Sequence, residues 1–442
     1  MAKVSDIFGK EGSDAWYAND ASYFLPDGFK CPHCGNDKGF DKEKDIMDVW
    51  FDSGSSHQAV CERRDYLTRP ADVYLEGADQ YRGWFQSSLL TSVAGGNGAP
   101  YKQIITHGWT VDGEGRKMSK SLGNGIAPKE VIDQYGADIL RRWVASADYH
   151  ADIRISPEIL KQISDNYRKI RNTARYCLGN LYDFNPDTDM VANENLEELD
   201  KYALMKLDEV LKVARYGYDN YEYHTTAHAL HNFCVVDMSN FYFDVLKNRL
   251  YTSAPNSNSR RAAQTVLYKV LDALTLVLTP ILAFTCDEIW KAMPHDASRN
   301  ADSPLFNEIP QADYIETDEE FISKWDRVHK IRTDAQKALE EARVAKIIGK
   351  PLEAKVTLHA QGELADFLNS VVHELPEIFI TSAVEIADGE GQIKGEVDGL
   401  SVSVTKAEGA KCERCWKYSN TVGSCADHPT LCKECADTMA QL

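Results

Sequence analysis

The sequence predicts a multidomain protein in which an α/β region is followed by an all-α region. The chain has 442 residues, which is enough for about three domains of ordinary size. Up to about residue 152, short apolar runs alternate with helical patterns, as is typical of a parallel α/β sheet. From about 156 to 293, apolar residues recur almost wholly at helical spacing, which predicts an antiparallel helix bundle.

The α/β region contains two predicted strands, each followed by helical sequence. We expect strands at 71–75 and 103–109, and helices over 79–94, from Pro128 and over 137–147. Ligands of parallel sheets bind beyond the carboxyl ends of the strands. Glu76, Gly77 and Asp79 follow the first strand directly, and a lysine-rich loop follows the second. Both groups are therefore expected at the same rim of the sheet.

The rest of the chain is predicted from periodicity and turn residues. The bundle helices are expected at 157–182, 197–220, 221–250 and 260–292. A further helix at about 319–346 and strands at 354–358, 378–380 and 400–404 suggest a small α+β module. The longest apolar run, Leu271 to Phe284, includes Asp272 and Pro280, so we interpret it as a buried helix rather than a membrane span.

Composition narrows the class of protein. Hydrophobic residues make up 43% and charged residues 26%, as in globular proteins. The net charge of −19 argues against a protein that coats nucleic acid, but a local basic face can still contact phosphates. Two helical stretches offer such a face, unless their basic residues are simply solvated: Lys161, Arg168, Lys169, Arg171 and Arg175, and Lys324, Arg327, Lys330, Arg332, Lys337, Arg343, Lys346 and Lys350. The N-terminus has no secretory signal, which predicts a cytoplasmic protein whose paired cysteines hold metal.

Lys117-Met-Ser-Lys-Ser121 is the strongest candidate for a phosphate-binding loop. It lies among Gly113, Gly115, Gly123 and Gly125, which would let the loop close over a ligand and reopen. Lysine ammonium groups are compact charges that suit a triphosphate. A solvated basic turn is the alternative interpretation.

The C-terminus carries the spacing of a structural zinc ribbon. Cys412 and Cys415 form one C-x2-C pair, and Cys432 and Cys435 form a second pair sixteen residues later. About thirty residues bury too little apolar surface to fold alone, and zinc binding can supply the difference. Cys425 and His428 lie between the pairs as rival ligands, and four reduced cysteines without metal are the alternative.

Two weaker patterns could also bind metal. Cys31-Pro-His-Cys34 is half of a knuckle site, for which Cys61 and His57 would be poor partners. His224, His228 and His231 fall on one helix face, where packing is the more common role of histidine.

Several strings of residues resemble the class I aminoacyl-tRNA synthetases, and among these the bacterial isoleucine-specific group. They are Asp45–Gly54 (DIMDVWFDSG), Tyr74–Gln80 (YLEGADQ), Arg82–Phe85 (RGWF), Lys117–Asn124 (KMSKSLGN) and Cys412–Tyr418 (CERCWKY). The resemblance covers essentially the whole chain. It implies a partial Rossmann-type nucleotide-binding fold, a helical anticodon-binding bundle, a small α+β module and a zinc ribbon, at 1–155, 156–315, 316–408 and 409–442.

The resemblance also implies the roles of individual residues. Glu76 would bind the isoleucyl-adenylate, with Gly77, Asp79 and Gln80 beside it and Trp50 lining the amino-acid pocket. Lys120 would contact ATP, a substrate accompanied by Mg²⁺, and Lys117 would assist it. The implied reaction is ATP-dependent activation of isoleucine and its transfer to tRNA(Ile), by a monomer without membrane attachment.

One departure from the family pattern changes the expected activity. None of the 12 histidines lies in a His-x-Gly-His motif, and the first half of the nucleotide fold and the editing insertion have no counterpart. We therefore expect a C-terminal portion that is inactive alone or complemented by a separate N-terminal piece, which would also carry the partner of Cys31 and Cys34. A non-catalytic tRNA-binding module and a sister synthetase of different amino-acid specificity are the alternatives.

Overall fold

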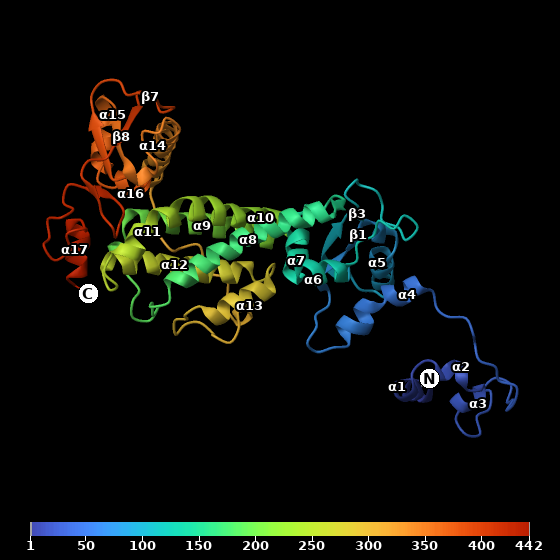
Figure 1. Cartoon of the computed structure of the whole chain (residues 1–442). Helices are drawn as coiled ribbons and strands as arrows, with labels where there is room; N and C mark the ends of the chain where they lie inside the picture. Colours follow the sequence, from blue (N-terminus) through green and yellow to red (C-terminus); the bar gives the residue numbers. More distant parts are fainter. Residues whose placement is uncertain (1, 442) are drawn as a thin grey trace. The chain divides into compact units, whose positions relative to one another are not determined.

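The computed structural model describes residues 2–441, which divide into two units, 1–108 and 109–442 (Figure 1). The division falls inside the first domain expected from the sequence, and the expected domain boundaries stay predictions. Each unit is described by itself.

The first unit begins with three short helices around a small aromatic cluster. These are α1 (Ala2–Glu11), α2 (Ala15–Ala18) and α3 (Ala21–Phe24). The rings of Phe8, Trp16 and Phe24 pack together, with centroids 4.8–6.4 Å apart. Lys42, on the loop that follows, donates hydrogen bonds to carbonyls of α2 and its C-cap, and it lies 5.7 Å from the Trp16 ring. These contacts hold the loop that carries Cys31 and Cys34 against the three helices.

A parallel β-α-β unit forms the rest of the first unit. It comprises α4 (Val49–Gly54), the π-helical turn η1 (His57–Glu62), β1 (Ala71–Gly77), the 3-10 turn η2 (Ala78–Arg82), α5 (Trp84–Ala94) and β2 (Tyr101–His107). β1 pairs in parallel with β2, from Ala71 opposite Tyr101 to Gly77 opposite His107. This confirms the predicted parallel strands, although the second strand lies two residues earlier than expected. Within the described residues the sheet has only these two strands.

The second unit begins with the segment that carries the lysine loop. β3 (Thr110–Val111) pairs in parallel with β4 (Ile153–Arg154), and α6 (Pro128–Tyr135) and α7 (Ala137–Ser146) lie between them in the chain. Gly136 joins the two helices at a φ of 92°, which a glycine adopts without strain. Apolar side chains of this segment and the next helix form one small core, consisting of Val131, Ile139, Trp143, Ile155 and Leu160.

The predicted helix bundle is present. It contains α8 (Pro157–Asn180), η3 (Asn193–Asn195), α9 (Glu198–Asp219), α10 (Tyr223–Asn232), η4 (Phe233–Tyr242), α11 (Phe243–Thr252), α12 (Asn258–Leu278), α13 (Ala283–Ala292) and η5 (Pro304–Phe306). The helix expected at 221–250 has a π-helical middle, η4. The helix expected at 260–292 ends at Leu278, because Pro280 lacks an amide hydrogen and cannot continue it.

A buried ion pair joins three helices of the bundle. The Arg249 guanidinium donates to both carboxylate oxygens of Asp200, at 3.1 and 2.7 Å, and to the Ser259 carbonyl at 2.8 Å. The Tyr242 hydroxyl also donates to Asp200, at 2.7 Å. The Asp200 side chain is inaccessible to solvent, so the pair exists only because these donors replace water.

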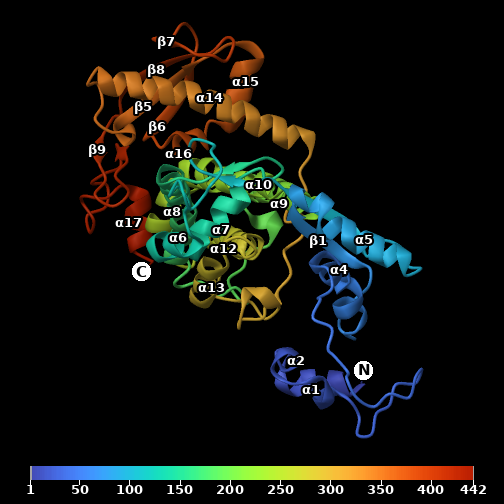
Figure 2. The same cartoon turned by 90° about the vertical axis from the view of Figure 1, so that its right-hand side faces the viewer.

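An α+β module follows the bundle. It comprises α14 (Glu319–Val344), η6 (Pro351–Glu353), β5 (Ala354–His359), α15 (Gly362–Val371), α16 (Leu375–Phe379), β6 (Ala383–Ala387), β7 (Ile393–Lys394) and β8 (Ser401–Lys406). The strand order is β6-β5-β8-β7, with only the β5–β6 pair parallel. Figure 2 shows α14 lying along this sheet.

The strand predicted at 378–380 is wrong. Residues 375–379 form α16, whose first turn contains Pro376. Leu375, Ile378 and Phe379 are all buried, and their spacing of three and four residues places them on one helix face. Ile380 then ends the helix in the left-handed conformation. The strand that pairs with β5 comes three residues later, as β6.

The chain ends in a small ribbon, with β9 (Ala410–Lys411) antiparallel to β10 (Tyr418–Ser419) and a short helix, α17 (Lys433–Met439). Among residues 2–441, no helix combines the length and the apolar character that crossing a membrane requires.

Candidate functional site

The lysine loop is held at its base by a buried carboxylate. Asp112 follows β3 and accepts hydrogen bonds from the amides of Glu114 and Arg116, at 3.0 and 2.8 Å. It also accepts from Arg116 Nε at 2.8 Å and from Asn124 Nδ2 at 2.9 Å. The Asn124 amide and the Arg116 donors hold the pKa of Asp112 well below its usual range. The carboxylate therefore stays charged and ties the two ends of the loop together.

Asn124 continues this anchor into the lysine motif itself. Its Oδ1 accepts from the Ser119 amide at 3.0 Å, and its Nδ2 donates to the Lys117 carbonyl at 3.3 Å. Met118 packs against the small core of α6 and α7. The loop is thus fixed from inside, while Lys117 and Lys120 are both exposed. Lys117 Nζ lies 5.5 Å from the Trp109 ring centroid, and its ammonium remains available to an anion.

The residues predicted to bind the adenylate cluster at the carboxyl end of β1 and the turn after it. Glu76 is exposed, and one of its carboxylate oxygens accepts from the Gly77 amide at 3.2 Å. A side chain at Gly77 would meet Asp79 Oδ1 at 2.6 Å and the His107 ring at 3.6 Å. Gln80 accepts from the Trp84 amide at 3.0 Å, which orients its side chain at the start of α5.

Trp50 lies beside this turn because α4 packs on α5. Asp48 caps α4 by accepting from the Trp50 amide at 2.9 Å. A Cβ at Gly83 would lie 2.8 Å from the Trp50 ring and 2.5 Å from Gln80 Oε1, so glycine is required there. The first unit therefore brings Trp50 and Gln80 together, as the sequence predicts. The close approach at Gly83 was not predicted, although a glycine before an aromatic helix start was the available signal.

The four predicted zinc ligands converge on one point. The Sγ atoms of Cys412, Cys415, Cys432 and Cys435 all lie within 4.8 Å of one another. The Cys415 and Cys432 sulfurs are 3.8 Å apart, which is about the separation of two thiolates on a tetrahedral zinc with bonds of about 2.3 Å. Among the described residues, this is the one group of three or more metal-ligating side chains, and neither Cys425 nor His428 belongs to it.

The thiols of this cluster differ in their electrostatic surroundings. Burial opposes ionisation of Cys412, but amide hydrogens of the ribbon, the nearest being that of Cys415, lower its pKa to about 6. Burial and the neighbouring sulfurs raise the pKa of Cys435 to about 11. A divalent cation would replace these protons and bind all four thiolates. The donor set therefore fits a structural zinc ion.

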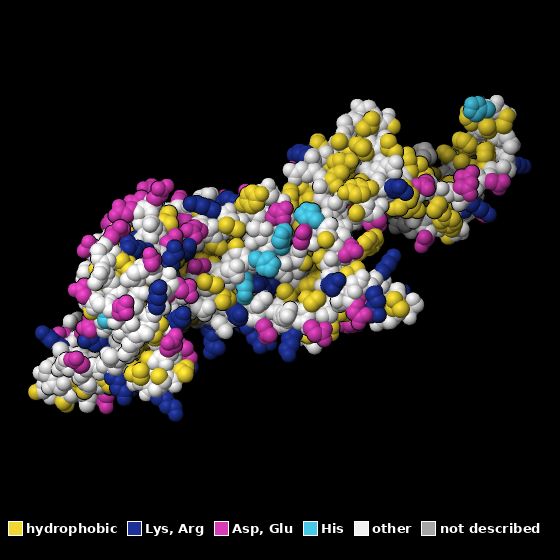
Figure 3. Space-filling view, turned by 90° about the horizontal axis from the view of Figure 1, so that it is seen from above, with side chains coloured by type: hydrophobic (Ala, Val, Ile, Leu, Met, Phe, Trp, Pro, Cys, Tyr) yellow, Lys and Arg dark blue, Asp and Glu magenta, His cyan; other side chains and the backbone are white. Residues whose placement is uncertain are grey.

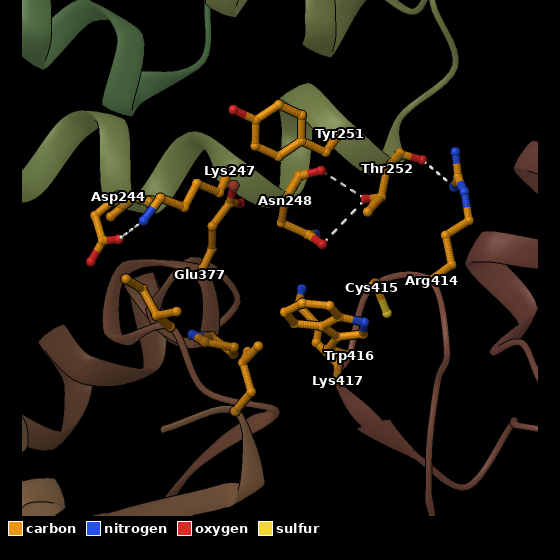
Figure 4. A pocket seen from close by; sticks show the side chains of 14 residues that line it. Asp244, Lys247, Asn248, Tyr251, Thr252, Glu377, Arg414, Cys415, Trp416 and Lys417 are labelled. Carbon is orange, nitrogen blue, oxygen red and sulfur yellow. Dashed lines mark hydrogen bonds and ion pairs between the residues drawn. The ribbon is translucent and has the colours of Figure 1, made fainter. Parts of the chain in front are cut away.

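A cavity of about 500 Å³ lies between the bundle and the ribbon (Figure 4). Trp416 of the ribbon contributes an indole that is 55% exposed, with Lys411 Nζ at 5.4 Å and Lys350 Nζ at 5.9 Å from its ring. Glu377 lines the opposite wall, and its buried Oε1 has no hydrogen-bond partner in the described part of the chain. Burial raises the pKa of Glu377. An unpartnered acceptor facing an aromatic ring makes this cavity a candidate ligand site.

The other expected groups are less clearly organised. The three histidines of α10 and Cys31 with Cys34 belong to no cluster of three or more ligands among residues 2–441. Several of the basic residues on α8 and α14 are paired with acids, for example Arg171 with Glu288 at 2.8 Å and Arg343 with Glu340 at 2.6 Å. Figure 3 shows acidic and basic side chains interspersed on one face. A role of these residues in phosphate binding stays a prediction.

Comparison with known families divides the chain into three matched parts. Residues 1–156 match the family described as tRNA synthetases class I (I, L, M and V). Residues 200–358 match the anticodon-binding domain of tRNA ligase, and residues 409–438 match the zinc finger found in FPG and IleRS.

Similar proteins cover the whole chain. It is 51% identical to an isoleucine–tRNA ligase of Desulforamulus reducens, over 100% of this chain and 48% of that protein. It is 53% identical to the isoleucine–tRNA ligase of Caldanaerobacter subterraneus subsp. tengcongensis, over 98% of this chain and 47% of that protein. The chain thus spans about half the length of the curated relatives it matches.

A solved structure supports the fold alone. The LeuRS of Agrobacterium radiobacter K84, in a ternary complex with tRNA and LeuAMS, matches 79% of this chain and 41% of its own, with a TM-score of 0.51 and 18% identity. By its sequence similarity, the chain belongs to the isoleucine–tRNA ligase family of class I tRNA synthetases.

Proposed function

We propose that this chain supplies about half of an isoleucine–tRNA ligase, namely the ATP-binding lysine loop, the adenylate-binding strand and the tRNA-binding bundle and ribbon. The observation that carries the proposal is the identity of 51% and 53% to isoleucine–tRNA ligases along essentially the whole chain. The proposed boundaries are 1–155 for the catalytic part, 156–315 for the anticodon-binding bundle, 316–408 for the α+β module and 409–442 for the ribbon.

The proposed reaction has two steps. Isoleucine attacks the α-phosphorus of ATP, which gives isoleucyl-adenylate and pyrophosphate, and the isoleucyl group then passes to tRNA(Ile). Lys117 and Lys120 would stabilise the negative charge on the reacting phosphate and on the departing pyrophosphate, with Mg²⁺ supplying further positive charge. The anchor of Asp112 and Asn124 supports this role, because it holds the loop without using either ammonium group.

The end of β1 is the proposed adenylate site. The exposed Glu76 carboxylate offers acceptors for hydroxyl or ammonium groups, and Gly77 lets a ligand approach the backbone closely. Asp79 and Gln80 would lie beside the ribose. Trp50 would offer an apolar wall to the isoleucine side chain.

The incomplete sheet supports a requirement for a further polypeptide. A two-stranded parallel sheet is unusual because parallel sheets are normally covered on both faces and contain more strands. Leu75 and Ile104 of β1 and β2 are 55% and 39% exposed. We propose that a separate N-terminal piece completes the sheet and the active site, and that the isolated chain does not activate isoleucine.

The cavity between the bundle and the ribbon is the proposed site for an unpaired tRNA base. Recognition of single-stranded RNA relies on stacking against aromatic side chains and on hydrogen bonds to base edges. Trp416 offers the stacking surface, Lys350 and Lys411 offer charge for phosphates, and Glu377 offers an acceptor.

Isoleucine-dependent exchange of pyrophosphate into ATP tests the catalytic proposal. The isolated chain should give no exchange, and coexpression with the N-terminal half of the Desulforamulus reducens relative should restore it. In that complex, Lys120→Ala should lower the rate by about 10²–10³-fold, because one preorganised donor to the transition state is lost. Lys129→Ala is the matched control, since Lys129 is equally exposed and pairs only with Asp133. Exchange by the isolated chain, or an equal effect of both variants, would contradict the proposal.

Gel-shift titration tests tRNA binding separately. The isolated chain should bind tRNA(Ile) in preference to a mismatched tRNA, and the affinity should fall with salt as phosphate contacts release counterions. Trp416→Ala should weaken binding by about 10-fold, since stacking on one base contributes about 1–3 kcal/mol. Trp290→Phe, which changes a buried indole of the bundle, is the control for general damage.

A further inference from the structure

The turn at Cys31 has the hydrogen bonds of a metal-binding knuckle. The Cys31 amide donates to the Asn36 carbonyl at 2.8 Å, and the Gly35 amide donates to the Cys31 carbonyl at 2.8 Å. Gly35 has a φ of 71°, in the left-handed region. The turn therefore brings the side chains of Cys31 and Cys34 to the same side of a closed backbone loop.

The first knuckle of the zinc ribbon has the same backbone pattern. The Cys412 amide donates to the Lys417 carbonyl at 2.9 Å, and the Trp416 amide donates to the Cys412 carbonyl at 2.9 Å. Trp416 occupies the position of Gly35 and has a φ of 64°. The two turns thus agree at both hydrogen bonds and at the left-handed residue. Because the ribbon turn belongs to a complete four-cysteine cluster, the agreement indicates that the Cys31 turn is also shaped to hold a metal ion.

The amides of the Cys31 turn also point at its first sulfur. The backbone N–H groups of His33 and Cys34 donate to the Cys31 sulfur and lower the pKa of that thiol. The Cys412 sulfur receives the same kind of donation from the amides of Arg414 and Cys415. Both first cysteines therefore lie in an amide nest that favours a thiolate, the form that binds metal.

The Cys31 turn supplies only half of a tetrahedral shell. Cys34 is exposed and Cys31 is half-buried, and no other ligating side chain within residues 2–441 forms a group of three with them. His57 is buried elsewhere, where its ring nitrogens contact Arg69 at 3.2 Å and Thr91 at 3.3 Å. Zinc bound by two thiolates would retain two open positions on the exposed side of the turn.

A second copy of the same turn can fill those positions. A tetrahedral ion has a two-fold axis that exchanges one pair of ligands with the other, so two identical turns can meet on it without distortion. The charge of the surrounding segment permits the approach, because residues 27–45 carry four lysines against five acids in a chain of net charge −19. We propose that Cys31 and Cys34 bind one zinc ion together with the same two cysteines of a second copy of this chain. This inference does not depend on the function proposed above.

Zinc content and sedimentation velocity of the full chain, measured together in the presence of a phosphine reductant, test the proposal. The expected result with zinc is a dimer carrying about 1.5 zinc ions per chain, one in each ribbon and half of a shared ion. A chelator strong enough to remove the shared ion should return the chain to a monomer. The reductant matters because Cys34 is exposed, and a disulfide between copies would otherwise imitate the dimer.

Three variants separate the sites. Cys31→Ser/Cys34→Ser should be a monomer with about one zinc per chain, whereas Cys61→Ser, which changes another half-buried cysteine of the same unit, should behave as the unaltered chain. Cys412→Ser/Cys432→Ser should lose the ribbon zinc and keep the zinc-dependent dimer. A monomer with one zinc, or a dimer that survives the Cys31→Ser/Cys34→Ser change, overturns the proposal. A monomer with two zinc ions also overturns it, because the shared ion would then not exist.

Discussion

His329 makes the stability of the α14 region depend on pH. Its ring lies on α14, 4.5 Å from the ring centroid of Phe241 and 5.0 Å from that of Tyr202, and its Nε2 is buried without a partner in the described structure. Burial lowers the pKa of His329 from 6.5 to about 4, and the positive charges of Arg332 and Lys206 act in the same direction. The folded protein therefore keeps this imidazole neutral in mildly acidic solution.

The sign and the size of the effect follow from proton linkage. Between pH 6.5 and pH 4 the unfolded chain binds a proton at His329 and the folded chain does not, so the free energy of unfolding falls as the pH falls through this range. A full shift of this size would remove about 2 kcal/mol between pH 8 and pH 5, since one pKa unit corresponds to about 1.4 kcal/mol. Because the ring is only partly shielded from water, we expect about 1–2 kcal/mol.

His329→Phe tests this reasoning. The phenyl ring can occupy the same stack and cannot titrate, so the variant should lose about 1–2 kcal/mol less than the unaltered protein between pH 8 and pH 5. Urea unfolding at both pH values, followed by the fluorescence of the tryptophans, measures the four free energies. His231, whose pKa burial also lowers to about 4, contributes equally to both proteins and cancels from the comparison. Equal pH dependence of the two proteins would refute the argument.

Three further predictions follow from the contacts described. Removal of zinc should unfold the ribbon, so that hydrogen exchange of residues 409–438 becomes fast while the bundle stays protected, because the ribbon core consists almost entirely of its cysteines. Protection that persists without metal would contradict this. Arg249→Met should lower the free energy of unfolding by about 3–5 kcal/mol, because Asp200 stays buried and charged, and adding Asp200→Leu should recover much of it in urea titrations. Asn124→Ala should release the loop and speed tryptic cleavage after its two lysines without changing the melting temperature, and Asn97→Ala, on another exposed loop, should leave cleavage unchanged.

Much of the fold could be predicted from the sequence because its local signals agree with its packing. The parallel β1 and β2 and the bundle helices follow directly from apolar periodicity. The π-helical stretch η4 could not be predicted, because its residues have ordinary helical spacing and only tertiary packing selects the wider turn. The strand prediction at 378–380 failed because a short apolar run is ambiguous between a strand and a buried helix.

The candidate site was predictable to a different degree in each part. Cysteine spacing alone identified the zinc ligands, since four thiolates at that separation have few other uses. The lysines of the loop were identified, but the Asp112 and Asn124 anchor was not. Both residues are of types that are common in turns, so the sequence offered no reason to connect two of them twelve positions apart.

The left-handed backbone at Trp416 sets stability against another use of the residue. A glycine adopts this conformation without strain, as Gly35 does in the equivalent turn, whereas a bulky side chain there costs about 1–2 kcal/mol. The ribbon nevertheless holds an indole at this position, half in solvent and between two ammonium groups. Trp416→Gly should therefore give a more stable ribbon with an impaired surface. A search for thermostable variants of this chain would tend to select that change, and an assay of folding alone would score it as an improvement.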